Sequence, residues 1–458
     1  MTDQPDLHQP TQEYGFSRDI FKSLQAALAE NDADHVRYII NPLHPADVAD
    51  IIEDLSPSER SHFIEIVRGT LDPEVLTQLE DNVREQVLEQ FSQEELVAAI
   101  SDLESDDAAL ILDDLDDEQQ RQILDVMSVE DRLPLEQTLS YGEDTAGRLM
   151  QREVVTAPLD WTLGQVIKSL EKYDNLPDNF YEIFIVDDKG VPKGAIPLSK
   201  ILRFHRLKPV LEVMNTDIKV ISVTLPQEEV AYIFRQYGLY SIPVVESDGH
   251  IVGMITIDDV MDVIEEEAGS EILKMAGVSH ETYHSTVVET CVSRLRWLFV
   301  TSINCLIASS VISHFEHVLE NHLVLAFLMP IVASMGGSAG MQVVTVTVRA
   351  LSTHHLKEGQ IWGVLKHELL VALLVGVVLS LTLSSITIAW FGSWFVGAIL
   401  AGALLGNILW SGLAGTLVPF VLSRLKMDPA ISAGPLLTTT TDVIGFALFL
   451  GLATLFLV

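Results

Sequence analysis

An aspartate lies inside the last apolar segment of the chain, where an ionised carboxylate is unfavourable. On a helix, Pro435, Thr438, Asp442 and Gly445 follow one another at steps of three, four and three residues, so they share one face. At a rise of about 1.5 Å per residue, Asp442 lies roughly 20 Å from Asp428 and roughly 24 Å from the C-terminus. That depth is near the middle of a hydrocarbon layer about 30 Å thick, where a carboxylate is costly unless it meets water, a cation or a partner. We therefore expect a functional role for Asp442; the alternative is a protonated or threonine-bonded structural residue.

The charge of the chain is divided between an acidic part and an apolar part. The 458 residues carry 28 Lys and Arg, 65 Asp and Glu, and a net charge of −37. Seven of these basic and six of these acidic residues lie from Cys291 onward, a balance of +1, so the first 290 residues carry −38. A negative field of this strength attracts cations and repels nucleic acids and anionic lipids, which excludes nucleic-acid binding.

The N-terminus is polar over residues 1–12 and lacks the apolar core of a signal peptide. We predict that residues 1–17 are disordered and that the acidic part stays in the cytosol, with the first apolar helix acting as the insertion signal. The two cysteines, Cys291 and Cys305, lie at or in the first apolar segment and do not suggest a disulfide framework.

Short amphipathic helices with acidic breaks are predicted over residues 18–143. The stretch 48–56 resembles the stretch 108–116, and each is followed by a polar turn and a second helix, over 60–67 and 119–127. Repeated helix pairs are typical of a helical stack, so we predict a superhelical, all-α N-terminal domain.

A clearer duplication covers residues 144–208 and 209–267. The matching segments are 149–150 with 213–214 and 185–194 with 244–253. Each copy follows the order strand, helix, strand, turn, strand, helix. The two copies resemble a tandem pair of CBS modules, an α/β regulatory fold, and this resemblance implies the sensing of adenine nucleotides or ions.

The second CBS-like copy contains a candidate nucleotide site. The resemblance implies that Thr256 binds phosphate and Asp259 binds ribose hydroxyls, and the N-terminus of the following helix also favours phosphate. The alternative is that both residues simply cap that helix. Pro197 and Lys200 stand at the matching positions of the first copy and cannot supply the pair. We therefore expect at most one ATP site, at the second module.

A helical connector is predicted over residues 268–296. Glu265, Glu266, Glu267 and Glu271 give its start a charged face, which is usually no more than a solvated surface. Here the face lies between the CBS-like copies and the apolar part, so we also consider these glutamates as cation contacts.

Five apolar segments predict five membrane-spanning helices in an all-α domain over residues 297–458. Their approximate bounds are 297–315, 322–350, 364–390, 394–422 and 430–458. The second is interrupted by the run 336–340 (Gly-Gly-Ser-Ala-Gly), and such a break is tolerated only against protein or a wet cavity. Lys and Arg flank the segments on one side only, which predicts a cytosolic N-terminus and an external C-terminus.

The domain order and several motifs resemble the MgtE family of magnesium channels, from about Arg18 to the end of the chain. The matching motifs are 329–330, 336–342, 348–351, 428–430 and 435–445. One departure is Ser338, where many members carry Asn in a GGNxGxQ run. The resemblance implies a homodimer in the bacterial plasma (inner) membrane, in contact with lipid. Its pore would lie on the two-fold axis, lined by the second and fifth spans, with Asp442 of each subunit forming the ion site.

The chemistry of Mg²⁺ suits such a pore. The ion holds its waters tightly, so it is best bound hydrated, through outer-sphere carboxylates and carbonyls near Asp442, Thr438, Thr439 and Gly340. A divalent ion gains about 4.6 kcal/mol on crossing a potential of about 100 mV, twice the single-charge value. No fuel site is then required, and the sequence has no GxxxxGK[ST] motif.

The resemblance also implies feedback gating, in which cytosolic Mg²⁺ bridges acidic surfaces and holds the pore closed. When the ions leave, like charges repel and the domains separate. The candidate sensor carboxylates are Asp102, Asp106, Asp107, Asp113, Asp114, Asp116, Asp117, Glu265, Glu266, Glu267, Glu271 and Asp428. Asp428, at the predicted cytosolic start of the last span, is the best single candidate; any of the others could be merely solvated.

Several alternatives stay open at this point. Asp442 alone does not distinguish a Mg²⁺ channel from an exchanger or from a channel for Co²⁺ or another divalent cation. A CBS-based membrane sensor without ion flux is a further alternative, although it needs neither a buried aspartate nor a glycine break. An enzyme is not predicted, because the spans contain no nucleophile–base pair or metal triad.

Two histidine motifs are poor metal sites. The loop residues His314, Glu316, His317, Glu320 and His322 have no standard ligand spacing, so a plain polar loop is favoured. His367-Glu368 begins like a zinc-protease helix, but Val371 stands where the second histidine is required.

Overall fold

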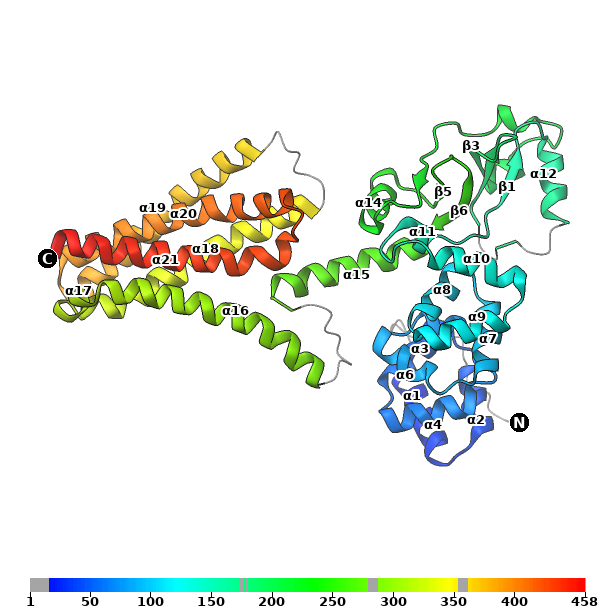
Figure 1. The fold of residues 1–458 in the computed structure, drawn as a ribbon, viewed down its shortest axis with the longest axis horizontal. Helices are drawn as coiled ribbons and strands as arrows, with labels where there is room; N and C mark the ends of the chain where they lie inside the picture. Colours follow the sequence, from blue (N-terminus) through cyan, green and yellow to red (C-terminus); the bar gives the residue numbers. More distant parts are fainter. Residues whose placement is uncertain (1–15, 173–175, 178–179, 279–286, 353–360, 458) are drawn as a thin grey trace. The chain divides into compact units, whose positions relative to one another are not determined.

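The structure, a computed structural model, describes residues 16–172, 176–177, 180–278, 287–352 and 361–457 (Figure 1). The chain separates into two compact units, Met1–Glu265 and Glu266–Val458. Most of the segment predicted to be disordered, residues 1–15, lies outside the described residues. Ser17 already caps the first helix, since its side chain accepts a hydrogen bond from Ile20 N at 3.3 Å.

Ten helices occupy residues 16–143, all of which the structure describes. They are α1 (Arg18–Ala29), α2 (Ala33–Ile40), α3 (Pro45–Asp54), α4 (Pro57–Val67), α5 (Glu74–Thr77), α6 (Asp81–Leu88), α7 (Gln93–Asp102), α8 (Ser105–Asp113), α9 (Asp117–Val126) and α10 (Val129–Leu139). The predicted helix pairs are present as α3–α4 and α8–α9.

Local capping explains where these helices begin. Ser56 starts α4 and Asp116 starts α9, each in a capping box in which side chain and backbone exchange hydrogen bonds with the residue three positions on. The apolar faces then bury into one shared core that includes the fully buried Ile51 and Phe63. The predicted helical N-terminal domain is confirmed.

Two three-stranded sheets form the rest of the first unit, within its described residues. In each, the first strand pairs parallel to the second, and the second pairs antiparallel to the third. The elements are α11 (Ala146–Leu149), β1 (Thr156–Pro158), α12 (Leu163–Leu170), β2 (Glu182–Val186), β3 (Pro192–Pro197), α13 (Leu198–Arg203), η1 (Val210–Glu212), β4 (Ile221–Ser222), α14 (Gln227–Tyr237), β5 (Ser241–Val245), β6 (Ile251–Thr256) and α15 (Ile257–Met275). The order predicted for each α/β copy is confirmed (Figure 1).

The two copies pack through a reciprocal contact. A Cβ placed on Gly194 would lie 2.9 Å from Met214 Sδ, and one on Gly253 would lie 2.8 Å from Met150 Sδ. Each methionine belongs to the segment that leads into the other copy, and the residue after it forms a backbone bridge to the strand that carries the glycine. The glycines are therefore needed for close approach of the two copies.

The connector helix predicted over 268–296 is not continuous. α15 begins before this range, on the last strand of the second copy, and ends at Met275. Gly277 has a φ of +76°, and the N–H groups of Gly277 and the next residue donate to carbonyls three and five residues back, at 3.0 and 2.9 Å. This Schellman arrangement ends a helix, and only glycine adopts it without strain. Residues 279–286 lie outside the described residues, and the next helix begins at Val287.

The second unit is helical. Its helices are α16 (Val287–His314), α17 (Glu316–Asn321), α18 (Val324–Ser352), α19 (Ile361–Phe391), α20 (Trp394–Arg424) and α21 (Pro429–Leu457). Among the described residues, five of these are long and apolar enough to cross a membrane, which agrees with the five predicted spans. α20 packs against α18, α19 and α21, and α16 packs against α21 (Figure 1).

The glycine run 336–340 does not break the second span, so that prediction was wrong. α18 is one continuous helix from Val324 to Ser352. The small residues instead permit close packing, because Ser411 Oγ of α20 donates to Gly336 O at 2.8 Å. A Cβ on Gly340 would also lie 2.8 Å from Leu437 Cδ2 of α21. Small residues at such crossings are typical of membrane helices.

Candidate metal centres

The Asp442 carboxylate is half-buried on α21 and has no hydrogen-bond partner among the described residues. Thr438, one turn earlier, is exposed, whereas Thr441 and Gly445 are buried. The face predicted from the sequence therefore runs from the surface of the unit into the bundle, with Asp442 at the boundary. The alternative of a threonine-bonded structural aspartate has no support in this geometry.

Four consecutive threonines precede Asp442, and each hydroxyl donates to a carbonyl of its own helix. The bonds run from Thr438 to Gly434 and Pro435, from Thr439 to Pro435, from Thr440 to Leu437 and from Thr441 to Thr438, at 2.7–3.2 Å. Donation uses only the hydroxyl hydrogen, so the oxygen lone pairs can still accept hydrogen bonds from the water shell of a cation. Thr438, Thr439 and Thr440 thus offer oxygen acceptors close to the carboxylate, whereas Thr441 is buried.

Asp428 caps the start of α21. Its Oδ1 accepts a hydrogen bond from Ala430 N at 2.8 Å, and its Oδ2 lies 3.7 Å from Lys274 Nζ of α15. Met275 packs on the apolar cluster at the same end of the bundle. An ammonium group therefore already stands beside this carboxylate, and a cation bound here would compete with Lys274. A partly exposed pair of this kind is worth only about 0–1 kcal/mol, so it can be displaced.

A second group of carboxylates forms where the first turn of α8 meets the first turn of α15, within the first unit. We call it the α8–α15 carboxylate cluster, and its members are Glu104, Asp106, Asp107, Asp258, Asp259 and Asp262. A helix N-terminus tolerates acidic residues, because the positive end of the helix dipole offsets their charge. In this cluster two such helix starts come together, so their carboxylates repel one another.

Hydrogen bonds to the segment before β1 hold α8 in this position. Ser105 Oγ donates to Glu153 Oε2 at 2.8 Å and accepts from Arg152 N at 2.7 Å. Gln151 Nε2 donates to Glu104 Oε2 at 2.6 Å. The repulsion is therefore opposed by a specific docking of the helical domain on the α/β copies.

Burial raises the pKa of five carboxylates in the cluster, and repulsion by neighbouring carboxylates adds to the effect; the five are Glu104, Asp106, Asp107, Asp259 and Asp262. Burial followed by neighbouring carboxylates raises the pKa of Glu104 to about 7. The same two causes raise the pKa of Asp107 to about 6. Burial raises the pKa of Asp259 to about 7, although hydrogen bonds from Thr256 act in the opposite direction.

Asp106 is the most constrained member of the α8–α15 carboxylate cluster. Burial and the charge of Asp259 raise its pKa well above its ordinary value. Its Oδ1 is buried and has no hydrogen-bond partner within the described part of the chain. A carboxylate in this state requires a proton or a cation.

Two of the predicted sensor residues have a different role. Asp113 accepts two hydrogen bonds from Arg148 Nη1, both at 2.8 Å. Asp114 pairs with the buried guanidinium of Arg84. Arg84 of the helical domain and Arg148 of α11 balance these two charges, so the structure does not bring them into the α8–α15 carboxylate cluster.

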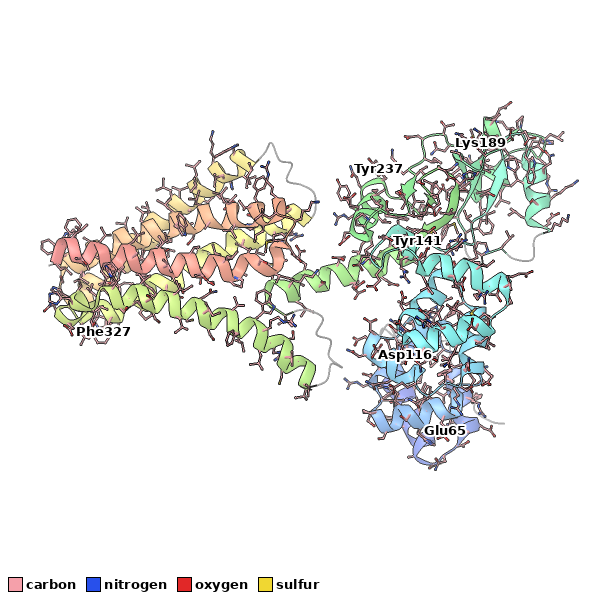
Figure 2. All side chains as sticks on the ribbon, in the orientation of Figure 1. Glu65, Asp116, Tyr141, Lys189, Tyr237 and Phe327 are labelled. Carbon is pink, nitrogen blue, oxygen red and sulfur yellow. The ribbon has the colours of Figure 1, made fainter. Side chains whose placement is uncertain are left out.

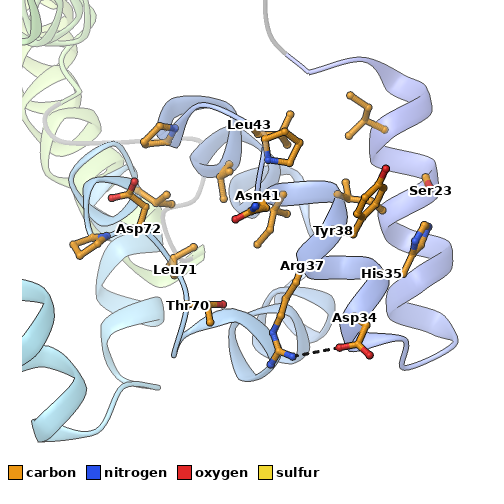
Figure 3. A pocket seen from close by; sticks show the side chains of 18 of the residues that line it. Ser23, Asp34, His35, Arg37, Tyr38, Asn41, Leu43, Thr70, Leu71 and Asp72 are labelled. Carbon is orange, nitrogen blue, oxygen red and sulfur yellow. Dashed lines mark ion pairs between the residues drawn. The ribbon is translucent and has the colours of Figure 1, made fainter. Parts of the chain in front are cut away.

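The remaining predicted sensor residues are spread over other surfaces. Asp102 lines a cavity of about 1130 Å³ in the helical domain (Figure 3), which also contains the Asp34–Arg37 ion pair at 3.8 Å. Asp116 (Figure 2) and Asp117 are exposed at the start of α9. The glutamates Glu265, Glu266, Glu267 and Glu271 lie along α15 beyond Asp262.

Three members of the cluster, Glu104, Asp258 and Asp262, were not predicted from the sequence, and Asp259 was predicted only as a ribose contact. A signal was present, because Asp258, Asp262 and Glu265 recur at steps of four and three and so share one helix face. The sequence does not reveal that this face packs near α8, because α8 lies about 150 residues earlier in the chain.

The candidate nucleotide residues bind each other in this structure. Thr256 Oγ1 donates to Asp259 Oδ2 at 2.6 Å, and Thr256 N donates to the same oxygen at 3.3 Å. This is the helix-cap arrangement that the sequence left as the alternative. Ribose binding by Asp259 would require it to exchange these partners, so the ATP site stays a prediction.

No group of three or more His, Cys, Asp or Glu side chains is arranged to hold a metal ion directly, among the residues that the structure describes. That statement includes His314, His317 and His322, which the structure places at the end of α16, in α17 and at the C-cap of α17 rather than in the predicted plain loop. A cation at Asp442 or at the α8–α15 carboxylate cluster would therefore be held through its water shell or after a change of side-chain positions. Such binding suits an ion that keeps its waters.

Comparison with known proteins divides the chain along the same lines. Residues 43–144 match the MgtE intracellular N domain, residues 146–206 and 210–266 match the CBS domain, and residues 329–452 match MgtE, described as a divalent cation transporter. A magnesium transporter MgtE of Thermus thermophilus is 31% identical over 95% of this chain and 98% of its own length. This chain belongs to the MgtE family.

Other MgtE proteins support the same assignment. The magnesium transporter MgtE of Bacillus subtilis is 28% identical over 92% of this chain and 94% of its own length. The crystal structure of the cytosolic domain of an Mg²⁺ channel MgtE, solved in complex with ATP, is 29% identical, with a TM-score of 0.50. The match covers 53% of the present chain and 99% of the chain in that crystal structure.

The MgtE assignment settles several sequence predictions. The chain is a multi-pass membrane protein of a magnesium transporter family, with Mg²⁺ as substrate, and it is not an enzyme. The multidomain fold, with a helical N-terminal domain, a CBS pair and five apolar helices, is confirmed.

The raised pKa values predict how stability depends on pH when divalent cations are removed by a chelator. Between about pH 4, where unfolded Asp and Glu release their protons, and about pH 7, where Glu104 and Asp259 release theirs, the folded state binds more protons than the unfolded state. The free energy of unfolding of the first unit therefore falls as pH rises through this range, and then levels off.

Urea unfolding of residues 1–275 with chelator, at pH values from about 5 to about 8, measures this dependence. We expect Asp107→Asn to flatten the profile and the exposed Asp117→Asn to leave it unchanged. A stability that rises over this interval, or equal effects of the two variants, would contradict the proposed origin of the pKa shifts.

Proposed function

We propose that this chain is a passive Mg²⁺ channel whose pore is lined by Asp442 and closed by cytosolic Mg²⁺ at the acidic centres. The observation that carries the proposal is the Asp442 carboxylate, half-buried within a membrane span and without a protein hydrogen-bond partner in the described residues. A carboxylate at that depth is expensive unless a cation or water stands beside it. A transported ion supplies that compensation.

The geometry around Asp442 suits a hydrated ion better than a bare one. One carboxylate and a run of threonine oxygens cannot replace the six waters that Mg²⁺ holds at near-octahedral geometry, but they can accept hydrogen bonds from those waters. The membrane potential then drives the ion inward, with the N-terminus in the cytosol and the C-terminus outside. An ion carried in this way needs no energy-coupling site.

We further propose a homodimer in the bacterial plasma (inner) membrane, with the pore on the two-fold axis between α18 and α21 of the two subunits. Two Asp442 carboxylates then face one hydrated ion and share its charge. Support comes from α21 itself, since Thr438 is exposed and Asp442 is only half-buried within one chain. A second subunit would convert this surface into a pore lining.

Replacing the proposed pore carboxylate should stop transport without unfolding the protein. Asp442→Asn keeps the shape of the side chain but removes its charge, and a loss of only about 1.4 kcal/mol of ion stabilisation already amounts to a tenfold change. We therefore expect Mg²⁺ flux into proteoliposomes, followed with an indicator dye, to fall by about tenfold or more.

The matched control is Glu320→Gln, which removes an exposed carboxylate from α17 outside the spans and should leave flux unchanged. Normal flux through folded Asp442→Asn would exclude Asp442 from the ion path. The same assay with Co²⁺, or with an imposed counter-ion gradient, separates a Mg²⁺ channel from the alternatives of a Co²⁺ channel and an exchanger.

Closure is proposed to follow from the α8–α15 carboxylate cluster. Burial and other carboxylates raise the pKa values of Glu104 and Asp106, and Asp106 keeps a buried oxygen without a partner in the described residues. With Mg²⁺ bound, α8 and α15 can stay together. Without it, repulsion favours separation and is opposed by docking contacts such as those of Ser105 and Gln151 and the Arg148–Asp113 pair. Asp428 and the glutamates of α15 are proposed as further contacts for regulatory Mg²⁺ at the membrane end of that helix.

Neutralising the α8 side of the α8–α15 carboxylate cluster should weaken the proposed response to Mg²⁺. In Asp106→Asn/Asp107→Asn, both the ligands and the repulsion are reduced, so the difference between Mg²⁺-bound and Mg²⁺-free forms shrinks. We expect the Mg²⁺ concentration that protects the first unit from limited proteolysis to rise at least several-fold, or protection to become independent of Mg²⁺.

The control for this experiment is Asp117→Asn/Glu118→Gln, which removes the same charge from the exposed start of α9. Equal effects of the two double variants would attribute the response to the overall charge rather than to the cluster. Flux recordings at high internal Mg²⁺ then show whether the protected form is the closed one. Mg²⁺-dependent protection without any flux would favour the CBS-based sensor instead.

ATP binding at the second CBS module is proposed on the strength of the ATP-bound relative and of Thr256 and Asp259 at the start of α15. Thr256→Val keeps the size of the side chain but removes its hydroxyl, and it should weaken ATP binding by about tenfold, the value of one lost hydrogen bond to a charged group. Titration calorimetry on the full chain measures this change. Lys200→Ala, at the matching position of the first copy, is the control and should have no effect; the reverse result would place the site elsewhere.

A further inference from the structure

We infer that Asn407 of α20 is a positioning residue that sets the rotation and depth of α21, and thereby places Asp442. Asn407 is fully buried in the middle of a membrane span. Its Nδ2 donates to Val332 O of α18 at 3.0 Å. The same amide lies against Gly336 of α18 and Gly445 of α21. One side chain thus contacts both of the helices proposed to line the pore.

The fit around the amide depends on the absence of side chains at two positions. A Cβ on Gly445 would lie 2.6 Å from Asn407 Nδ2 and 3.1 Å from its Cγ. A Cβ on Gly336 would also overlap the amide, at 2.8 Å from Asn407 Cγ. Distances under 3.0 Å are not seen for real Cβ atoms, so a methyl group at either position must displace a helix or the amide. We refer to Asn407, Gly336 and Gly445 as the Asn407 contact.

Apolar packing alone does not account for an asparagine here. The Oδ1 atom of Asn407 is buried and has no hydrogen-bond partner among the residues that the structure describes. An unsatisfied amide oxygen costs about 1–3 kcal/mol, which a leucine or alanine would avoid. Ser411, one turn further along α20, donates to both Gly336 O and Asn407 O at 2.8 Å and reinforces the same crossing. The polar group is therefore best explained by the specific register that it imposes.

This register is transmitted to Asp442 over a short distance. Gly445 follows Asp442 by three residues, which is less than one helical turn and a rise of about 4.5 Å. A rotation or shift of α21 at Gly445 therefore moves the carboxylate by nearly the same amount. The inference rests on the proposed function, in which Asp442 lines the ion path, and it deepens that proposal by naming what holds the carboxylate in place.

The test is a double-mutant cycle between the two sides of the contact. Gly445→Ala should lower Mg²⁺ flux by about tenfold, because the methyl group forces α21 away from Asn407. Asn407→Ala should lower flux as well, since the side chain that fixes the position of α21 is lost. In Asn407→Ala/Gly445→Ala the new methyl group occupies the vacated space, so flux should recover above that of Gly445→Ala. The matched control is Gly451→Ala on the same helix, where a Cβ would meet nothing within 4 Å.

Two further measurements keep the inference testable if one variant does not fold. Gly336→Ala should behave like Gly445→Ala, whereas Gly337→Ala, which has nothing within 4 Å of its Cβ, should behave like the wild type. The Mg²⁺ concentration for half-maximal flux should change in the Asn407 and Gly445 single variants, because the carboxylate has moved. A purely structural defect would lower the amount of active protein and leave that concentration unchanged.

The outcomes separate this inference from the proposed function. If Asp442→Asn abolishes flux but the effects of the Asn407 and Gly445 variants simply add, the positioning role is overturned while the pore role stands. If Asp442→Asn keeps full flux, the pore role fails and the positioning role fails with it. Coupling between positions 407 and 445 in thermal unfolding alone, without coupling in flux, would reduce the contact to helix packing and overturn the inference.

Discussion

A carboxylate removed from water is stable only beside a compensating positive charge or a proton, and both proposed centres of this protein depend on that constraint. On α21, Asp442 is half-buried at membrane depth, and the hydroxyls before it donate to their own helix. In the first unit, two helix starts bring six carboxylates together, and burial raises the pKa values of Glu104, Asp106, Asp107, Asp259 and Asp262. In the proposed function Mg²⁺ would suit both places for the same reason: it keeps its waters, so neither centre would have to provide a complete set of direct ligands.

Much of the fold could be predicted from the sequence, because its strongest signals are local. The apolar segments, the duplicated α/β copies and the paired amphipathic helices all have clear periodicity, and each is present in the structure. The two errors both concern glycine. At Gly277 a left-handed residue ends a helix that was predicted to continue, whereas the run at 336–340 stays helical. Which outcome applies depends on neighbours from other elements, such as Ser411 and Asn407 against Gly336, and these cannot be deduced from the glycines alone.

The candidate sites show the same division between local and long-range information. Asp442 could be singled out because its cost follows from its own span. The α8–α15 carboxylate cluster could be named only in part, since Asp106 and Asp259 become neighbours through the docking of Ser105 and Gln151. Asp113 and Asp114 looked equivalent to Asp106 and Asp107 in the sequence, but Arg148 and Arg84 balance their charges. Residue type identifies possible ligands, whereas the fold decides which of them lack a counter-charge.

The reciprocal packing of Met150 on Gly253 and of Met214 on Gly194 means that neither CBS module is a free-standing part. Pro197 and Lys200 stand in the first module at the positions of Thr256 and Asp259 in the second, so the ATP site is proposed for the second module alone. The segment that leads into the first module nevertheless packs against β6 of the second module. A chain shortened by that first module would lose the Met150 contact and the Gln151 backbone bridge on β6, the strand that runs directly into α15. The first module therefore supports the strand of the second module that leads into α15.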